Sequence, residues 1–137
     1  MQENTRSSLF LMEQVIAITV FALFAAVCTA IMINAFFKAN DARDLNYALI
    51  AAKNGAEAYR IYGSPEEAAS SLGGRAHSPG SADIYYDRNW RVCGEQDAVF
   101  VLRFNTADDA ARPPASELTV ERMAGGEIIA LTVTSGW

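Results

Sequence analysis

A chain of 137 residues with a formal net charge of −5 has the length of one domain of modest size. Eleven basic against sixteen acidic residues exclude the basic surface typical of nucleic-acid binders, so no nucleic-acid partner is expected. The two cysteines, Cys28 and Cys93, lie in segments of different character, one apolar and one polar, which excludes a small fold held by disulfides.

Residues 14–37 form the longest apolar run, and the thiol of Cys28 is its only ionisable group. As a helix, at about 1.5 Å per residue, this run spans the hydrocarbon core of a bilayer, roughly 30 Å thick. A secretory signal peptide has a shorter apolar region, and a lipoprotein would need small residues ahead of Cys28, where Val27 stands. The run therefore predicts one retained membrane-spanning helix.

Glu13 stands at the beginning of this run, directly after the apolar residues 9–12. A charged side chain costs about 2.5 kcal/mol or more at full depth in a bilayer. An intramembrane carboxylate therefore predicts a functional role and a cationic partner. The alternative is a solvated carboxylate at the level of the lipid headgroups.

The segment RSSLFLMEQV, from Arg6 to Val15, resembles the N-terminal signature of type IV pilins and pseudopilins. That family has a short polar leader, a small residue at the cleavage point, and a glutamate as the fifth residue of the mature chain. The resemblance implies a leader at residues 1–8 and cleavage between Ser8 and Leu9 by a prepilin peptidase. It also implies N-methylation of Leu9 and a role for Glu13 in assembly. Ser8 stands where the family usually has glycine.

The resemblance further implies that the chain is a structural subunit, a pilin or pseudopilin, of a type IV pilus-like or type II secretion- or competence-like filament. Other pilin subunits would be its partners through the helix at residues 9–37, with an assembly platform and its ATPase as indirect partners. The N-terminus would lie in the cytoplasm and residues 38–137 outside, first at the cell membrane and then in a surface filament. The alternative is a solitary single-pass anchor that displays an extracytoplasmic binding domain.

Residues 39–62 are predicted to continue the helix, because they contain no proline and are rich in alanine. Apolar residues recur there at three- and four-residue steps in two strips. The first strip is Leu45, Ala48, Leu49, Ala52, Ala56 and Tyr59, and the second is Tyr47, Ile50, Ala51, Ala58 and Ile61. Two strips suit a helix that packs its own domain on one side and a neighbouring subunit on the other. The alternative is one wide buried face.

Residues 63–80 are predicted as a loop in which Pro65 can begin a short second helix. From residue 81 the apolar period changes to two, which predicts an antiparallel sheet of four to five strands over residues 81–137. The strands are expected at residues 82–86, 90–93, 98–104, 118–123 and 127–134, with a polar linker at 105–116 and hairpin turns at 87–89 and 124–126. Either of two apolar rows, that of Leu102 or that of Leu131, can cover the first helical strip. The predicted fold is α+β, one long helix packed on this sheet.

No catalytic, cofactor or metal site is predicted, and the chain is not expected to be an enzyme. His77 lies in a Gly/Ser/Pro segment without a neighbouring acid or cysteine, whereas a general base needs a positioned partner. Cys93 has no histidine neighbour in sequence and is predicted to be an inert strand cysteine. The oxygens of Asn105, Asp108 and Asp109 match no calcium-binding spacing.

Overall fold

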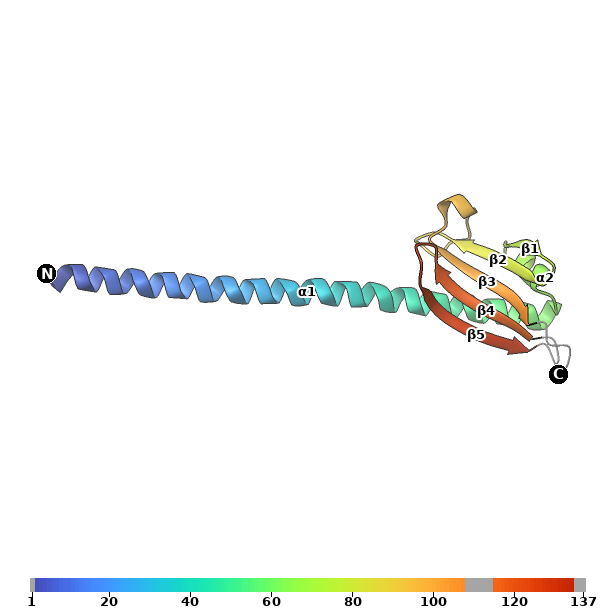
Figure 1. Ribbon diagram of the computed structural model, residues 1–137, viewed down its shortest axis with the longest axis horizontal. Coiled ribbons are helices and arrows are strands. Elements are labelled where there is room, and N and C mark those ends of the chain that lie inside the picture. The colour runs from blue at the N-terminus through green and yellow to red at the C-terminus, as the bar shows by residue number, and fades with distance from the viewer. Residues whose placement is uncertain (1, 108–114, 135–137) are drawn as a thin grey trace. The chain divides into compact units, whose positions relative to one another are not determined.

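The computed structural model describes residues 2–107 and 115–134, with side chains described from Arg6 onward. The chain forms two compact units, Met1–Ala42 and Arg43–Trp137. Helix α1 (Gln2–Tyr62) makes up the described part of the first unit and continues into the second (Figure 1). The predicted α+β fold, a long N-terminal helix packed on an antiparallel sheet, is confirmed.

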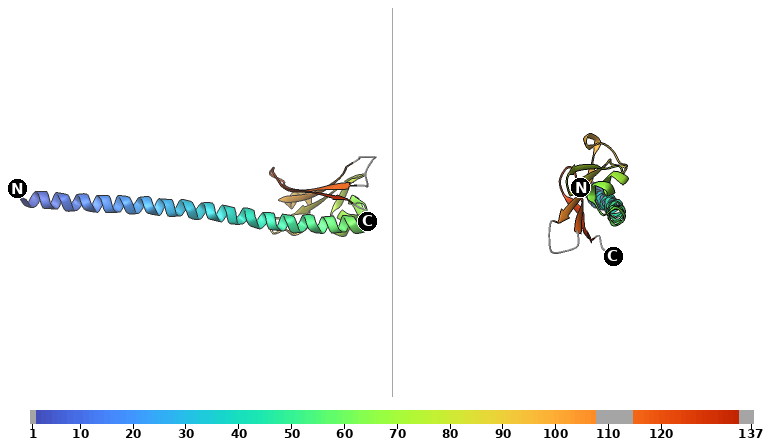
Figure 2. Two further views of the ribbon diagram at one scale, coloured as in Figure 1. Left: turned by 90° about the horizontal axis from the view of Figure 1, so that it is seen from below. Right: turned by 90° about the vertical axis from the view of Figure 1, so that its right-hand side faces the viewer.

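The second unit contains one five-stranded sheet in which each strand is antiparallel to the next in the chain. Its strands are β1 (Arg75–Ser78), β2 (Ser81–Tyr86), β3 (Phe100–Ala107), β4 (Ala115–Arg122) and β5 (Glu127–Thr134). The short helix α2 (Pro65–Ser71) precedes β1, and the 3-10 turn η1 (Glu95–Asp97) precedes β3. All strands lie on one side of the α1 segment that belongs to this unit (Figure 2).

One face of the sheet is apolar from β2 to β5, because directly paired residues project to the same face. The register pairs Ile84 with Leu102, Leu102 with Val120, and Val120 with Ile129. The apolar rows of Leu102 and Leu131 therefore belong to the same face. The large side chains of this face that are fully buried are Phe104, Ile84, Leu102, Leu118 and Val120.

The α1 face that packs on the sheet consists mostly of small residues. Its buried members are Ala48, Ala51, Ala52, Gly55, Ala58 and Tyr59. Apart from Gly55, they come from the two predicted strips, whereas Leu45 and Leu49 of the first strip are 48% and 50% exposed. The prediction that the sheet covers the first strip is therefore wrong for its two leucines. Small side chains bring the helix axis close to the sheet and leave the larger side chains at the flanks.

Within residues 63–80, the short helix predicted to begin at Pro65 is confirmed as α2, whereas β1 forms where only a loop was predicted. Helix α2 begins at Pro65, and Ser64 caps it by accepting a hydrogen bond from the N–H of Glu67 at 3.3 Å. The sequence does not reveal β1, because all four of its residues are exposed and none supplies an apolar alternation. Gly74 allows the chain to approach β2 closely, since a Cβ at this position would lie 2.8 Å from the carbonyl oxygen of Asp83.

The strand predicted at residues 90–93 does not form. The turn predicted at residues 87–89 forms but extends into this segment, because the Oδ1 of Asp87 accepts hydrogen bonds from the backbone N–H groups two and four residues later, at 2.7 and 3.0 Å. Trp90 adopts a left-handed φ of 59°, which a strand does not allow. One isolated bridge between Tyr86 and Val92 is all that remains of the expected hairpin.

The linker predicted at residues 105–116 is shorter at both ends than expected. Strand β3 continues to Ala107 and β4 begins at Ala115, and these two residues pair with each other. The turn predicted at residues 124–126 is confirmed between β4 and β5. Gly125 and Gly126 have positive φ values of 101° and 116° there, which glycine adopts without strain.

Candidate functional site: an unpaired carboxylate in an apolar helix

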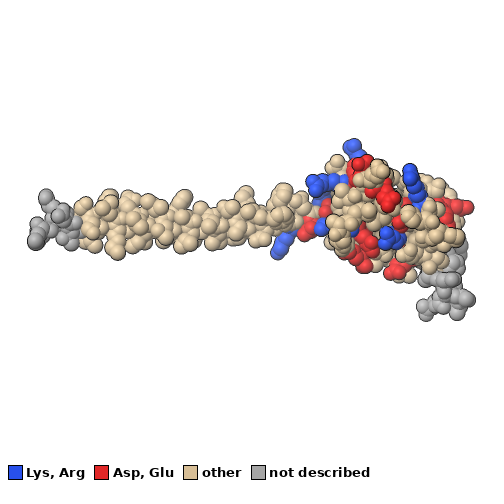
Figure 3. Space-filling view, turned by 45° about the horizontal axis from the view of Figure 1, so that its top comes forward, with Lys and Arg blue, Asp and Glu red and all other residues tan. Residues whose placement is uncertain are grey.

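The first unit presents an apolar helix whose large side chains are exposed. Between Leu9 and Phe37 this exposure reaches 76% at Phe21 and 77% at Met32. Among the residues that the structure describes, α1 is the one helix long and apolar enough to cross a membrane. The face drawn in Figure 3 shows most acidic and basic side chains gathered on the second unit and an uncharged surface along most of the α1 segment that belongs to the first unit. An apolar surface on all sides requires an apolar environment.

Two hydroxyl groups inside this helix are satisfied by the helix itself. The Oγ1 of Thr19 donates to the carbonyl oxygen of Val15 at 2.7 Å, and that of Thr29 donates to Ala25 at 2.8 Å. Such hydrogen bonds to the preceding turn remove the need for water. The threonines are therefore compatible with a hydrocarbon environment.

Glu13 differs from these threonines because the described residues of its own helix offer it no partner. The residues one turn away on its face are Leu9, Phe10, Ile16 and Ala17, and no side chain among them can donate a hydrogen bond or carry a positive charge. Within the described residues, no hydrogen bond or ion pair reaches the exposed Glu13 carboxylate. In an apolar environment this charge must therefore be neutralised by a group other than these neighbours.

The predicted cleavage residues Ser8 and Leu9 lie near the beginning of α1, and both are exposed. No break separates the predicted leader from the helix, since residues 2–8 already belong to α1. Leu9 and Glu13 are four residues apart and therefore share a helix face, about 6 Å from each other along the axis. The structure thus places the three predicted site residues within two turns of one another.

In the second unit, two residues that are distant in sequence line one small hollow. His77 of β1 and Cys93 share a space of about 120 Å³ with Arg75, Tyr85 and Glu95. His77 thus has no acid or cysteine near it in the sequence, but Cys93 and Glu95 line the same space, because β1 folds back onto β2 beside the segment that follows Val92. The missed strand is the reason that sequence reasoning did not find this hollow.

The thiol in this hollow is held in its neutral form. Burial raises the pKa of Cys93, and the negative charges of Asp87 and Asp97 raise it further. A raised pKa opposes nucleophilic reactivity. Among the described residues, no group of three or more His, Cys, Asp or Glu side chains is placed to hold a metal ion. Asn105 lies within β3, and residues 108–109 of the weighed calcium site are outside the described part.

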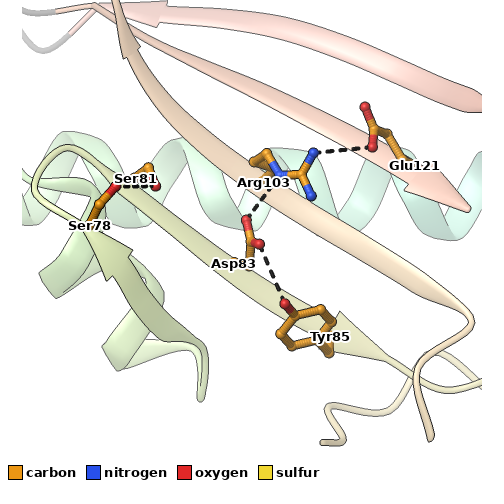
Figure 4. A network of polar contacts seen from close by, with 6 residues as sticks. All are labelled: Ser78, Ser81, Asp83, Tyr85, Arg103 and Glu121. Carbon is orange, nitrogen blue, oxygen red and sulfur yellow. Dashed lines mark hydrogen bonds and ion pairs between the residues drawn. The ribbon is translucent and has the colours of Figure 1, made fainter. Parts of the chain in front are cut away.

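The opposite face of the sheet carries a polar network centred on Asp83, which is only 5% exposed (Figure 4). The Nε of Arg103 donates to Asp83 Oδ1 at 3.3 Å, and its Nη1 donates to Glu121 Oε2 at 3.4 Å. The hydroxyl of Tyr85 donates to Asp83 Oδ2 at 3.5 Å. Burial, and then the charge of Asp83, raise the pKa of Tyr85. The network neutralises a buried carboxylate and links β2, β3 and β4, which is a structural role.

Comparison with known proteins identified no family model, curated protein or solved structure that matches this chain. The candidate site must therefore be interpreted from its own chemistry. Its distinguishing feature is the pair Leu9 and Glu13 on one face of an exposed apolar helix, with no cation in the described residues to pair with the carboxylate.

Proposed function

We propose that this chain is a structural subunit, a pilin or pseudopilin, of a type IV pilus-like or type II secretion- or competence-like filament. It is made with its N-terminus in the cytoplasm and one helix in the cell membrane, and residues 38–137 lie outside. A prepilin peptidase removes residues 1–8, Leu9 is N-methylated, and an assembly platform with its ATPase adds the subunit to a surface filament. The other subunits contact it through their N-terminal helices.

The observation that carries this proposal is the Glu13 carboxylate, which has no partner among the described residues of its own helix. After cleavage, the new α-amino group of Leu9 is a cation at the end of the same helix. Two parallel helices that are staggered by about one turn, some 5 Å, bring this ammonium beside the Glu13 of a neighbour. Pairing offsets the cost of holding each charge in a low-dielectric bundle, whereas a misplaced subunit leaves both unpaired. Glu13 thus sets the axial register of assembly.

The second candidate function is a solitary membrane anchor that displays its sheet domain for a ligand. The free edge of β5 is the observation in its favour, because β4 is its one sheet neighbour among the described residues. The two candidates differ in what they require of Glu13, since a simple anchor has no use for a carboxylate at that position.

Substitution of Glu13 tests the proposal directly. We expect Glu13→Ala and Glu13→Gln to reduce incorporation into filaments at least tenfold, with membrane insertion and domain stability unchanged. Immunogold labelling of surface filaments and quantification of the chain in sheared material would measure this. The matched control is Gln14→Ala, which alters the adjacent polar side chain and should assemble normally. Normal assembly of both Glu13 variants would favour the solitary anchor.

A further inference from the structure

We infer that Arg6 pairs with Glu13 of a second copy of this chain while residues 1–8 are still attached. The two helices are parallel in the membrane, and they are offset along their axes by seven residues, about 10.5 Å. This inference rests on the part of the proposed function that places α1 in a membrane. It adds a contact between chains that precedes cleavage.

The first observation is that the N-terminal part of α1 carries two opposite charges on one face. Between Asn4 and Phe37, Arg6 is the only basic residue and Glu13 is the only acidic one. Seven residues make nearly two full turns of helix, so the two positions lie within about 20° of each other around the axis. One cation and one carboxylate therefore lie on the same side of the helix.

The second observation is that the two charges do not pair within one chain. Helix α1 runs without a break from Gln2, so both residues belong to one regular helix, and both side chains are exposed. Helical side chains meet at spacings of three or four residues, whereas Arg6 and Glu13 are about 10.5 Å apart along the axis. Among the described residues, no ion pair joins them. Their pairing therefore requires a neighbouring helix.

The third observation is the length of the apolar stretch. Residues 9–37 carry one charged side chain, Glu13, and as a helix they are about 43 Å long. The hydrocarbon core of a bilayer is roughly 30 Å thick, so part of this stretch is in excess. Two copies that are offset by about 10.5 Å still overlap over about 33 Å of it. Both copies can therefore span the same bilayer, with the pair of charges at the edge of the core.

A second copy of the chain supplies both the complementary charge and the matching orientation. Identical sequences insert into a membrane in the same orientation, so the helices of two copies are parallel. With no offset, Arg6 would face Arg6 and Glu13 would face Glu13, and like charges across a contact repel each other. An offset of seven residues replaces this repulsion with attraction between Arg6 of one copy and Glu13 of the next.

Cleavage between Ser8 and Leu9 exchanges this offset for another. It removes Arg6 and creates an ammonium group at Leu9, four residues from Glu13. The offset that pairs opposite charges then falls from about 10.5 Å to about 6 Å. The contact between uncleaved chains thus keeps Glu13 out of the register that the proposed filament uses, and removal of the leader releases it.

The first test measures association of the uncleaved full chain, without peptidase, in vesicles of phosphatidylcholine. Energy transfer between donor-labelled and acceptor-labelled copies reports association. We expect Arg6→Gln and Glu13→Gln each to weaken association about fivefold or more, and their combination to weaken it no further. Reversal of both charges, Arg6→Glu with Glu13→Arg, should restore it. The matched control, Arg6→Gln with Ser7→Arg, keeps the charge but turns it about 100° around the helix, so it should not restore association.

The second test measures the offset by disulfide cross-linking. In a background of Cys28→Ser and Cys93→Ser, chains that carry Leu9→Cys are mixed with chains that carry Ile16→Cys. These two positions lie side by side when the copies are offset by seven residues. We expect the mixed product to exceed the product of two Leu9→Cys chains, and we expect Glu13→Gln to remove this excess.

Equal association of Arg6→Gln and the original chain would overturn the inference. Restoration by Ser7→Arg would also overturn it, because a general effect of charge would then explain the result, and so would preferential cross-linking between two Leu9→Cys chains. These outcomes are distinct from failure of the proposed function, which is judged by incorporation of the processed chain into filaments. Association that depends on Arg6 in the vesicles would support this contact even if Glu13→Ala assembled normally.

Discussion

Gly55 of α1 faces Leu118 of β4 so closely that no side chain fits between them. A Cβ built on Gly55 lies 2.8 Å from Leu118 Cδ2, and the side chains of Leu102 and Phe104 approach the same position to 3.0 and 3.1 Å. Glycine lowers helix stability at an interior position by about 1 kcal/mol relative to alanine. Its presence is explained by the contact between helix and sheet.

Gly55→Ala is expected to destabilise the second unit. The crowding of fully buried side chains costs about 1–3 kcal/mol, which exceeds the gain of about 1 kcal/mol in helix propensity. Urea unfolding of the full chain in micelles, followed by tryptophan fluorescence, would show a net loss of roughly 1 kcal/mol by this comparison. Asn54→Ala, on the exposed face of the same turn, is the control and should be neutral or slightly stabilising. An increase in stability for Gly55→Ala would contradict the packing argument.

Stability is expected to fall at strongly alkaline pH because of two buried tyrosines. Burial raises the pKa of Tyr86 above its ordinary value of 10.0, and burial together with Asp83 raises the pKa of Tyr85. The folded state therefore holds these protons more tightly than the unfolded state. The stability that these two tyrosines contribute is therefore fully present below pH 10, and it is lost as the pH rises through their pKa in the folded state.

Tyr86→Phe keeps the buried ring but removes this titration. The free energy of unfolding measured from pH 8 to pH 11 should fall less steeply in this variant than in the original chain. Tyr62→Phe, at an exposed tyrosine of α1, is the control and should leave the slope unchanged. An identical slope in all three chains would show that Tyr86 does not contribute.

Cys93 is expected to react slowly with thiol reagents in the folded protein. In a Cys28→Ser background, which leaves one thiol, alkylation by iodoacetamide at pH 8 should be severalfold slower than in urea, because burial keeps the thiol protonated. Asp97→Asn removes a nearby negative charge and should increase the rate, whereas Glu117→Gln should not. Rates measured by mass spectrometry that are equal in folded and unfolded protein would exclude this account.

Processing after Ser8 is expected in assembled material. Mass spectrometry of the N-terminus should identify Leu9 as the first residue, carrying a methyl group. Ser8→Arg places a bulky charged side chain at the cleavage point and should leave the leader attached in more than about nine tenths of the chain. Ser7→Arg, one position earlier, is the control. A chain that still begins at Met1 within filaments would remove the amine that we assign as the partner of Glu13.

The sequence predicts those parts of the fold that have a regular apolar period or a strong local signal. The apolar run, the continuation of the helix to Tyr62, the turn at Gly125 and the whole of β5 belong to this group. Strand β1 is absent from the prediction because its residues are exposed, and only its pairing with β2 defines it as a strand. The strand expected at residues 90–93 has suitable residues, but the hydrogen bonds of the Asp87 carboxylate extend the preceding turn into it.

The candidate functional features also divide into those that the sequence predicts and those that only the folded structure reveals. Glu13 can be predicted from sequence because an isolated charge in an apolar run is visible without a fold. The free edge of β5 and the exposed flank at Leu49 cannot, because they depend on which strand is outermost and which helix face the sheet covers. Sequence periodicity places Leu49 in the strip that the sheet was expected to cover, but the structure shows that alanines contact the sheet and that the leucine remains exposed.

The small residues on the buried face of α1 also influence how the second unit folds. The helix is synthesised before every strand that covers it, so this face is unprotected until β3 and β4 have formed. Alanine and glycine expose little apolar surface during that interval, so the uncovered helix face has a low tendency to aggregate. The leucines of β4 and β5 are synthesised last. Because each strand pairs with its predecessor, the sheet can grow one hairpin at a time, with mostly local contacts. The arrangement leaves the apolar rows exposed to aggregation only near the end of synthesis.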